Sequence, residues 1–437
     1  MGFPLDRHAF NPALPTVLHV DLNSCFATIE QQANPLYRGK PLVVAAYPTP
    51  MGCVVAPSIE AKRYGCQTGM RVAECQKLCP RLIVLPPDPP KYRYVHLAIR
   101  RLLSRYTDRV VPRSIDEFVL HLDRTPSLER GTVGVARELK RRLRREIGDY
   151  LTVSVGIGPN RFLAKTAAGL HKPDGLEVID RRNFARVYRR LQLRDLTGID
   201  VGHTIRLNSV AVYSVLDFYQ ASAGVLTAGF HSSIGFDWYA RLRGWEVDAM
   251  PFGRKSFGHC YSLPRPLERE DELTPILAKL VEKMGARLRR AGYRAKGVEL
   301  AVLYADGRVW HRAATGKQEL FDGRDLYRRA YRLLVSAPPG AIRQLSVCCF
   351  RLADASVIQL DLFGEGQRQR DKVAAVDALN ARFGPFTVRP ATMLGSGEHV
   401  QDRISFGSVK ELEEYLFHGE GEAAAVDGIT DRTYDLP

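Results

Sequence analysis

Short apolar runs in the first part of the chain end at or contain acidic residues. The run VLHVD at 17–21 predicts a buried strand that presents Asp21 at its carboxyl end. The stretch VVPRSIDEFVLHLD at 110–123 predicts two strands joined by a bend, and LTVSVGIG at 151–158 predicts another strand followed by a helix. Strands that alternate with helices in this way predict one α/β layer that gathers these acidic positions.

The pattern changes after about residue 180. Residues 181–245 carry mainly helical spacing, and VDAMPFGRKS resembles a linker. A second α/β unit then follows in the order strand, helix, strand, strand, helix, strand, with a hairpin predicted at Asp306-Gly307. Thr274 as N-cap and Pro275 at the next position predict the start of its first helix.

Length and charge narrow the class of protein. The chain has 437 residues, enough for three or four domains, and a net charge of +15. Residues 410–437 hold eight acidic residues against two basic ones, so the rest of the chain is more basic still and predicts a polyanionic partner. Neither a long apolar run nor a secretory signal is evident, and the eight cysteines form no CxxC pair, which favours a cytoplasmic protein without a zinc site.

The acidic positions have the chemistry of a phosphoryl-transfer site. Mg²⁺ prefers oxygen ligands, and a pair of such ions on a few carboxylates can activate a hydroxyl and stabilise a leaving pyrophosphate. Asp21, Asp116 and Glu117 meet this need if the chain bends at Asp116, because neighbouring side chains of a regular strand point to opposite faces. An Asp-Glu pair by itself is more often a feature of a solvated turn.

Four ordered segments decide between these interpretations. VDLNSCFATIE (20–30), GCVVAPSIEAKRYGCQTGM (52–70), RSIDEFVLHLD (113–123) and VSVGIGPNRFLAKTAAGLHKPDG (153–175) together resemble the Y-family DNA polymerases, the group of bacterial DinB and UmuC. The resemblance implies an α/β (α+β) right-hand fold with palm, fingers, helical thumb and a ferredoxin-like little finger. The implied boundaries are palm 14–24 and 88–180, fingers 25–87, thumb 181–245, linker 246–253, little finger 254–358, clamp-binding peptide 359–363 and an extension with an acidic tail, 364–437.

The resemblance also implies roles for single residues. Asp21, Asp116 and Glu117 match the catalytic metal ligands, and the carbonyl of Leu22 matches a backbone ligand. Phe26 matches the aromatic steric gate, whose ring rejects a ribonucleotide because the 2′-hydroxyl would clash with it. Lys165 matches a lysine that meets the incoming triphosphate, where a cation offsets developing negative charge.

Some positions depart from the usual family pattern. Asn23 stands where many relatives have Asp, and Ile59 and Lys62 stand where a Tyr and an Arg lie over the triphosphate. Lys62 supplies charge without the bidentate fork of Arg, which predicts a weaker grip on the nucleotide. UmuC-like members share the Asn and the xEAK segment, whereas the FLAK and KPDG segments resemble DinB, so the branch stays open.

Other segments are expected to contact DNA and a protein partner. LTGIDVGHTIRLNSV (196–210) resembles the thumb hairpin that holds a strand through backbone amides, with Gly198 and Gly202 as candidates, but Asp200 there would repel phosphate. In the little finger the candidate phosphate contacts are Arg254, Lys255, Arg308 and Arg312. The segment Gln359-Leu360-Asp361-Leu362-Phe363 resembles the bacterial sliding-clamp peptide, although its alternating apolar residues also suit a strand.

The expected activity is low-fidelity translesion synthesis on primed template DNA with deoxynucleoside triphosphates. The expected cofactors are two Mg²⁺ ions, with Mn²⁺ as a substitute, and the expected enzyme is a monomer that binds the sliding clamp and no membrane. Two alternatives stay open. One is a catalytically weak or silent accessory protein that binds DNA and the clamp, and the other is a different phosphoryl-transfer enzyme, such as a cyclase, on the same palm.

Overall fold

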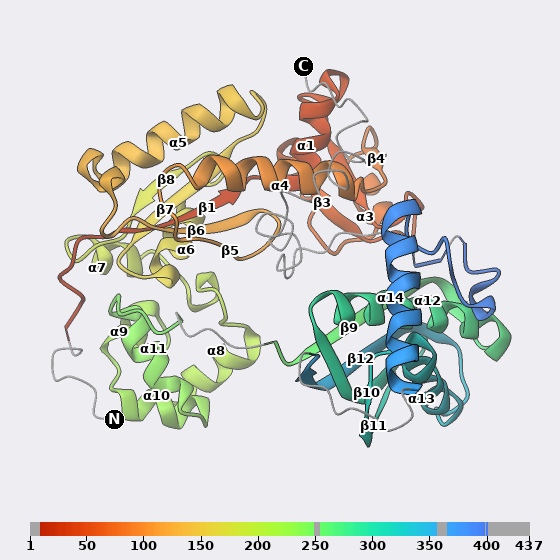
Figure 1. The fold of residues 1–437 in the computed structure, drawn as a ribbon. Coiled ribbons are helices and arrows are strands. Elements are labelled where there is room, and N and C mark those ends of the chain that lie inside the picture. The colour runs from red at the N-terminus through yellow and green to blue at the C-terminus, as the bar shows by residue number, and fades with distance from the viewer. Residues whose placement is uncertain (1–8, 249–253, 356–364, 398, 401–437) are drawn as a thin grey trace. The chain divides into compact units, whose positions relative to one another are not determined.

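A computed structural model describes residues 9–248, 254–355, 365–397 and 399–400. These residues fall into two compact units, one within Met1–Met250 and one within Pro251–Asp402, and each is described by itself (Figure 1). Within the described ranges, no helix combines the length and the apolar character that a bilayer crossing requires.

The central sheet of the first unit has β1 in its middle. Its strand order is β5-β6-β1-β7-β8, and β1 runs antiparallel to both of its neighbours. Leu18 and Val20 enter the main core with α4 and α5, whereas Val17 lies on the other face with Val119 and Ala164 of α6. The elements are β1 (Val17–Leu22), α4 (Pro89–Leu103), β5 (Val110–Pro112), β6 (Glu117–His121), α5 (Thr132–Glu146), β7 (Val153–Gly158), α6 (Arg161–Leu170) and β8 (Leu176–Val178).

Glycine in β7 lets α6 approach the sheet closely. A Cβ atom at Gly156 would lie 2.0 Å from the backbone oxygen of Ala164 and 2.1 Å from the nitrogen of Ala168. A side chain there would therefore push α6 away from the sheet. Because α6 carries Lys165, this contact sets where that lysine stands relative to β1.

Two further groups of elements complete the first unit. The predicted fingers contain the sheet β3-β2-β4, and the predicted thumb is helical with an aromatic core that includes Phe218, Phe230 and Trp238. The fingers elements are α1 (Cys25–Ala33), β2 (Leu42–Ala45), β3 (Val54–Pro57), α2 (Ile59–Arg63), α3 (Val72–Leu78) and β4 (Ile83–Leu85). The thumb helices are α7 (Phe184–Tyr188), α8 (Val201–Asn208), α9 (Val215–Gln220), α10 (Ala223–Phe230) and α11 (Ile234–Leu242).

The second unit has the strand, helix, strand, strand, helix, strand order that the sequence predicts. Its sheet, in the order β11-β10-β12-β9, packs one face on the two helices, and its hairpin turns at Gly307 with φ 89°. The elements are β9 (Ser256–Leu267), α12 (Glu270–Arg290), β10 (Tyr293–Tyr304), β11 (Val309–Leu320), α13 (Gly323–Val335) and β12 (Ile342–Asp354).

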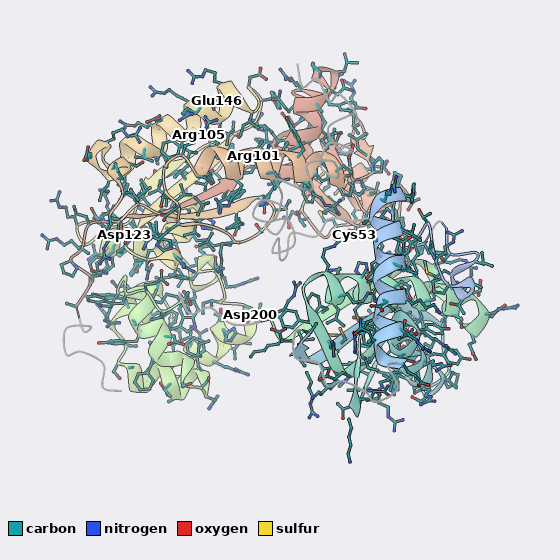
Figure 2. All side chains as sticks on the ribbon, in the orientation of Figure 1. Cys53, Arg101, Arg105, Asp123, Glu146 and Asp200 are labelled. Carbon is teal, nitrogen blue, oxygen red and sulfur yellow. The ribbon has the colours of Figure 1, made fainter. Side chains whose placement is uncertain are left out.

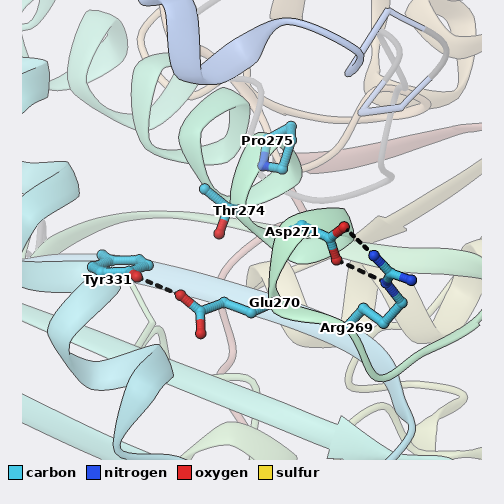
Figure 3. A pocket seen from close by; sticks show the side chains of 6 residues that line it. All are labelled: Arg269, Glu270, Asp271, Thr274, Pro275 and Tyr331. Atoms are coloured by element: carbon cyan, nitrogen blue, oxygen red, sulfur yellow. Dashed lines mark hydrogen bonds and ion pairs between the residues drawn. The ribbon is translucent and has the colours of Figure 1, made fainter.

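The predicted start of α12 was wrong. The helix begins at Glu270 and Pro275 lies inside it, so Thr274 is not the N-cap. Acidic residues in the first turn stabilise this earlier start through the helix dipole, and Glu270 also accepts a hydrogen bond from Tyr331 of α13 (Figure 3). Pro275 is the sixth residue of the helix, beyond the first turn, so its missing N–H removes one intrahelical hydrogen bond.

The described residues that follow β12, 365–397 and 399–400, belong to the second unit. Helix α14 (Glu365–Phe383) is joined to α12 by a bidentate pair between Arg289 and Asp377, with N–O distances of 2.6 and 2.8 Å. The buried Lys279 donates to the carbonyls of Ser396 and His399 at 3.1 and 2.5 Å. This part of the extension therefore covers α12 rather than extending freely.

Candidate active site

Strand register brings two of the predicted carboxylates together. Asp21 of β1 lies directly opposite Glu117, the first residue of β6, so their side chains share one face of the sheet. The predicted bend is present at residues 114–116, and it places Asp116 just before the strand. There the backbone carbonyl of Asp116 accepts a hydrogen bond from the Leu22 amide at 2.9 Å.

Each of the three acids has a partner of its own. Nζ of Lys165 donates to both carboxylate oxygens of Glu117 at 2.8 and 2.7 Å, and Nζ of Lys172 donates to Asp21 at 2.5 Å. The hydroxyl of Ser114 donates to Asp116 at 2.5 Å. The side chains of Asp21 and Glu117 are only 13% and 19% exposed, so these contacts are made in a poorly hydrated site.

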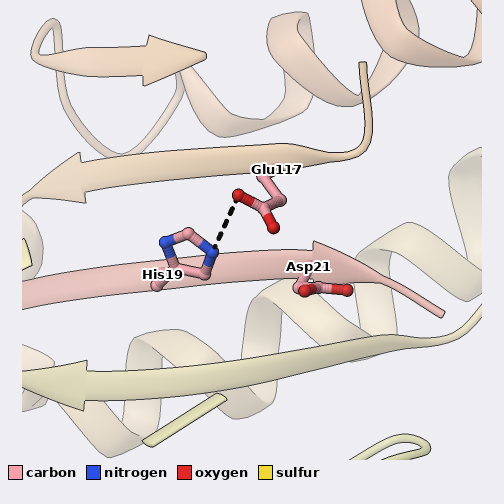
Figure 4. A group of neighbouring side chains, drawn as sticks. All are labelled: His19, Asp21 and Glu117. Carbon is pink, nitrogen blue, oxygen red and sulfur yellow. Dashed lines mark ion pairs between the residues drawn. The ribbon is translucent and has the colours of Figure 1, made fainter. Parts of the chain in front are cut away.

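His19 is a neighbour that the sequence analysis did not single out. It precedes Asp21 by two residues on β1, so both side chains lie on the same face, and ligand atoms of His19, Asp21 and Glu117 lie within 4.8 Å of one another (Figure 4). His19 is 2% exposed, and its ring nitrogens find no hydrogen-bond partner among the described residues. Burial lowers the pKa of His19 to about 4, so the ring is neutral at neutral pH.

The electrostatics of the acids differ. Burial raises the pKa of Asp116 to about 6, and the charges of Asp21 and Glu117 act in the same direction, against the Ser114 hydrogen bond. Burial also raises the pKa of Asp21, despite Lys172. Burial acts to raise the pKa of Glu117, but two groups lower it: His19, which is charged only at the low pH where Glu117 titrates, and Lys165. Because Asp21 and Asp116 resist ionisation, a bound cation would stabilise their charged forms.

The donor set fits a divalent cation. Asp21 and Glu117 provide hard oxygen ligands on adjacent rigid strands, which is what Mg²⁺ and Mn²⁺ take in phosphate-transfer sites. The predicted set is only partly assembled, because Asp116 lies outside the close group and is turned to Ser114. Nε2 of His19 lies 3.6 Å from Oε2 of Glu117, beside the carboxylates, and makes no hydrogen bond to any described residue.

Of the predicted nucleotide-binding residues, Phe26 is buried, whereas the lysines lie near the acids. Phe26 of α1 is fully buried and stacks on Tyr92, with ring centroids 4.3 Å apart. Lys62 of α2 is near enough to the acids to feel their charge: burial lowers its pKa, Lys172 acts in the same direction, and Asp21 and Asp116 oppose them. The structure thus brings Lys62, Lys165 and Lys172 to one group of acids, and the third of these was not predicted.

In the thumb hairpin, the structure gives Asp200 a role that was not predicted, as the N-cap of α8. Figure 2 labels Asp200, which stands just before α8. Its side chain caps α8 by accepting a hydrogen bond from the His203 amide at 2.7 Å, and it lies 2.9 Å from Nδ1 of His203. Gly198 has φ 98° and packs on Trp238, while Gly202 lies within α8. The acid therefore has a structural role in the helix start that a glycine would not provide.

The little-finger candidates do not form one group. Arg254 lies over the ring of Phe257 at 3.9 Å, and Lys255 is exposed. Arg308 pairs with Asp306 at 2.7 Å beside the hairpin turn. Arg312 stands opposite the buried Leu300 on β10, so it lies on the helix-covered side at the edge of the sheet. The predicted clamp peptide, Gln359 to Phe363, lies outside the described residues.

Comparison with known proteins places the chain in a family. Residues 20–169 match the model of the impB/mucB/samB family, and residues 254–362 match the model of the C-terminal domain of that family. DNA polymerase IV of Pelotomaculum thermopropionicum is 32% identical over 394 residues, which cover 89% of this chain and 97% of that protein. The chain belongs to the Y-family of DNA polymerases.

Other Y-family proteins agree with this assignment. DNA polymerase IV of Moorella thermoacetica is 33% identical, over 87% of this chain and 97% of the relative. Among solved structures, a Dbh-Dpo4-Dbh Y-family polymerase chimera has a TM-score of 0.68 at 24% identity and covers 77% of this chain and 99% of its own. A Dbh polymerase in an insertion ternary complex has a TM-score of 0.54 at 23% identity, over 76% and 98% of the two chains. The predicted right-hand fold is confirmed.

Proposed function

We propose that this Y-family member is a DNA-directed DNA polymerase that adds deoxynucleotides to a primer 3′-hydroxyl during low-fidelity translesion synthesis. The observation that carries the proposal is the pairing of Asp21 opposite Glu117 at the centre of the sheet, beside the bend that holds Asp116. Retention of all three acids in a poorly hydrated site supports catalysis, because burying them together has an electrostatic cost.

The metal ligands in this proposal are Asp21, Asp116, Glu117 and the carbonyl of Leu22. Two Mg²⁺ ions, replaceable by Mn²⁺, would supply activation of the primer hydroxyl and charge stabilisation at the leaving pyrophosphate. In this proposal, the side chain of Asp116 turns away from Ser114 to join the other ligands. The raised pKa of Asp116 is consistent with a carboxylate that is stabilised by an added cation.

The lysines of the site have a second role in the proposal. Lys62, Lys165 and Lys172 surround the acids from α2, from α6 and from the turn that follows α6, and each carries a charge that matches a triphosphate. Lys165 and Lys172 hold Glu117 and Asp21 in place through their ion pairs. Their ammonium groups would also bind the phosphates of the incoming nucleotide, where a cation offsets negative charge.

Primer extension tests this function directly. The wild-type chain with Mg²⁺ should extend a primed template past a lesion, and Asp116→Ala with Glu117→Ala should lose extension while still binding DNA. If the double variant lost DNA binding as well as extension, misfolding would be the cause, and circular dichroism would detect it. Undiminished extension by the double variant would show that these acids are not the catalytic ones.

The alternative function is a silent accessory protein that binds DNA and a clamp. It predicts DNA binding by the wild type without incorporation, at any concentration of Mg²⁺ or Mn²⁺. A cyclase on the same palm would convert a nucleoside triphosphate without primer or template. The same reactions with each component omitted therefore separate the three functions.

Binding to a bacterial sliding clamp is a separate part of the proposal. It rests on the residues Gln359-Leu360-Asp361-Leu362-Phe363, in which two apolar anchors follow a hydrogen-bonding glutamine. Stimulation of synthesis by a clamp should disappear in Leu362→Ala with Phe363→Ala, and synthesis without the clamp should stay unchanged. We also propose that the enzyme works as a monomer, which sedimentation of the purified chain tests.

A further inference from the structure

A second aromatic ring supports Phe26 from behind. The ring of Tyr92 stacks on Phe26, with centroids 4.3 Å apart and planes 11° apart, and both side chains are fully buried. Because the two rings are in contact over their faces, the position of Phe26 follows the position of Tyr92.

Tyr92 is fixed by a buried carboxylate. Its hydroxyl donates to Oε1 of Glu30 at 2.8 Å, and Nζ of Lys91 donates to Oε2 of Glu30 at 2.6 Å. Glu30 is 7% exposed, so both of its oxygens are used in a nearly dry environment. Burial, together with the charge of Glu30, raises the pKa of Tyr92, so its hydroxyl keeps the proton that it donates.

These contacts form a closed network between α1 and α4. Phe26 and Glu30 are four residues apart on α1, so they share one face of that helix. Lys91 and Tyr92 stand near the start of α4, where Asp88 caps the helix and pairs with Lys91 at 3.3 Å. Phe26 is thus connected to Glu30 by the backbone of α1, Glu30 to Tyr92 by a hydrogen bond, and Tyr92 back to Phe26 by ring stacking. A fully satisfied buried network of this kind is rigid.

We propose that Glu30 is a positioning residue for sugar selection: it anchors the Tyr92 hydroxyl and thereby keeps Phe26 where the ring excludes a ribonucleotide 2′-hydroxyl. The inference rests on the proposed polymerase function and on the gate role of Phe26. A ring can exclude one oxygen atom only if it cannot retreat, because a displacement of about 1 Å changes such contacts decisively. Glu30 touches neither substrate nor metal in this role.

The experiment compares a deoxynucleotide with the matching ribonucleotide on one primed template. Tyr92→Phe removes only the donated hydrogen bond, and Glu30→Ala removes the acceptor. Each should lower the ratio of the two kcat/KM values by about tenfold, the change expected from loss of one hydrogen bond. The change should come from faster ribonucleotide incorporation, with KM for the deoxynucleotide unaltered. Glu30→Gln keeps an acceptor and should retain the wild-type ratio.

The palm offers a matched control. Glu138 accepts from the Tyr106 hydroxyl at 3.2 Å and from Arg130 at 2.6 Å, which is the same chemistry as Glu30 with Tyr92 and Lys91. Tyr106→Phe and Glu138→Ala should therefore leave the ratio unchanged. If the ratio responded only to a general loss of stability, the variants of both networks would change it to a similar extent.

The outcomes separate the inference from the function on which it rests. If Phe26→Ala loses sugar selection but folded Tyr92→Phe and Glu30→Ala keep it, the anchor role is overturned and the gate stands. If Phe26→Ala also keeps selection, the gate and the inference both fall. If the wild type incorporates no nucleotide, the polymerase proposal itself fails. Should Glu30→Ala not fold, Tyr92→Phe decides alone.

Discussion

Nζ of Lys165 lies within 2.8 Å of both carboxylate oxygens of Glu117. The ammonium group therefore stands where a cation would bind, and it competes with any ion for the same two oxygens. Lys165 reaches this position because α6 approaches the sheet over Gly156. The pair thus has two consequences, one for metal affinity and one for nucleotide binding.

Replacing Lys165 by Met should change these properties in opposite directions. Mn²⁺ should bind about threefold more tightly to the DNA-free protein because the competing charge is gone. Incorporation should fall about a hundredfold because a cation that faces the triphosphate is lost. Electron paramagnetic resonance measures the free Mn²⁺, and single-turnover kinetics measure incorporation. Lys296→Met, which removes an ion-paired lysine of the second unit, is the control and should change neither.

Lys172 should act mainly on nucleotide binding. It pairs with Asp21 at 2.5 Å from a side chain that is 44% exposed, so it can move to a phosphate without a large desolvation cost. Lys172→Met should raise KM for the nucleotide by about tenfold with a smaller effect on kcat. Lys172→Arg keeps the charge and should restore most of the affinity. Equal KM values for the wild type and both variants would remove Lys172 from the triphosphate site.

Asp200 gives a test of the thumb hairpin. Asp200→Asn keeps an N-cap acceptor and removes the negative charge, so the helix should stay stable while affinity for primed DNA rises about threefold. Fluorescence anisotropy at low and high salt measures the affinity, and the difference should shrink as salt screens the charge. An affinity that does not respond to Asp200→Asn would mean that the hairpin does not approach a phosphate.

The elements near the site were predictable because their signals are local. The runs at 17–21 and 110–123 became β1, β5 and β6, and the predicted bend lies between the latter two. The start of α4 carries a less clear signal, because prolines such as those at 89 and 90 are also typical of a break in the chain. They occupy the first positions of the helix after the Asp88 cap, where no N–H is needed.

Other parts of the site depend on distant contacts. Lys172 meets Asp21 across 151 positions, and no local pattern marks that pair. His19 was hidden because a residue inside an apolar strand resembles a core residue, although alternation with Asp21 was a usable signal. Asp200 carried a local signal as well, since an aspartate before a helix is a common N-cap. Only the repulsion between its charge and a phosphate was considered.

The extension after β12 should contribute to the stability of the second unit. Lys279 is buried, and its ammonium group donates to the carbonyls of Ser396, Gly397 and His399. A methionine at this position would leave these three carbonyls without that donor. Lys279→Met should lower the free energy of unfolding by about 2 kcal/mol, since it leaves polar groups unpaired. Denaturant unfolding measures the loss. The exposed Lys317→Met is the control, and an equal effect of both would contradict the role of Lys279.

Asp116 should reduce the stability of the metal-free protein at neutral pH. Its pKa is raised from 3.8 to about 6 by burial and by the neighbouring acids, so the folded state binds this proton more tightly than the unfolded state does. Stability from this group is therefore greatest at low pH and is lost as pH rises from about 4 through about 6. Asp116→Asn should stabilise the metal-free protein by about 2 kcal/mol at pH 7.5 and by little at pH 4, while abolishing synthesis. Denaturant unfolding in EDTA at the two pH values measures this difference. A stabilisation that is the same at both pH values would exclude Asp116 titration as its cause.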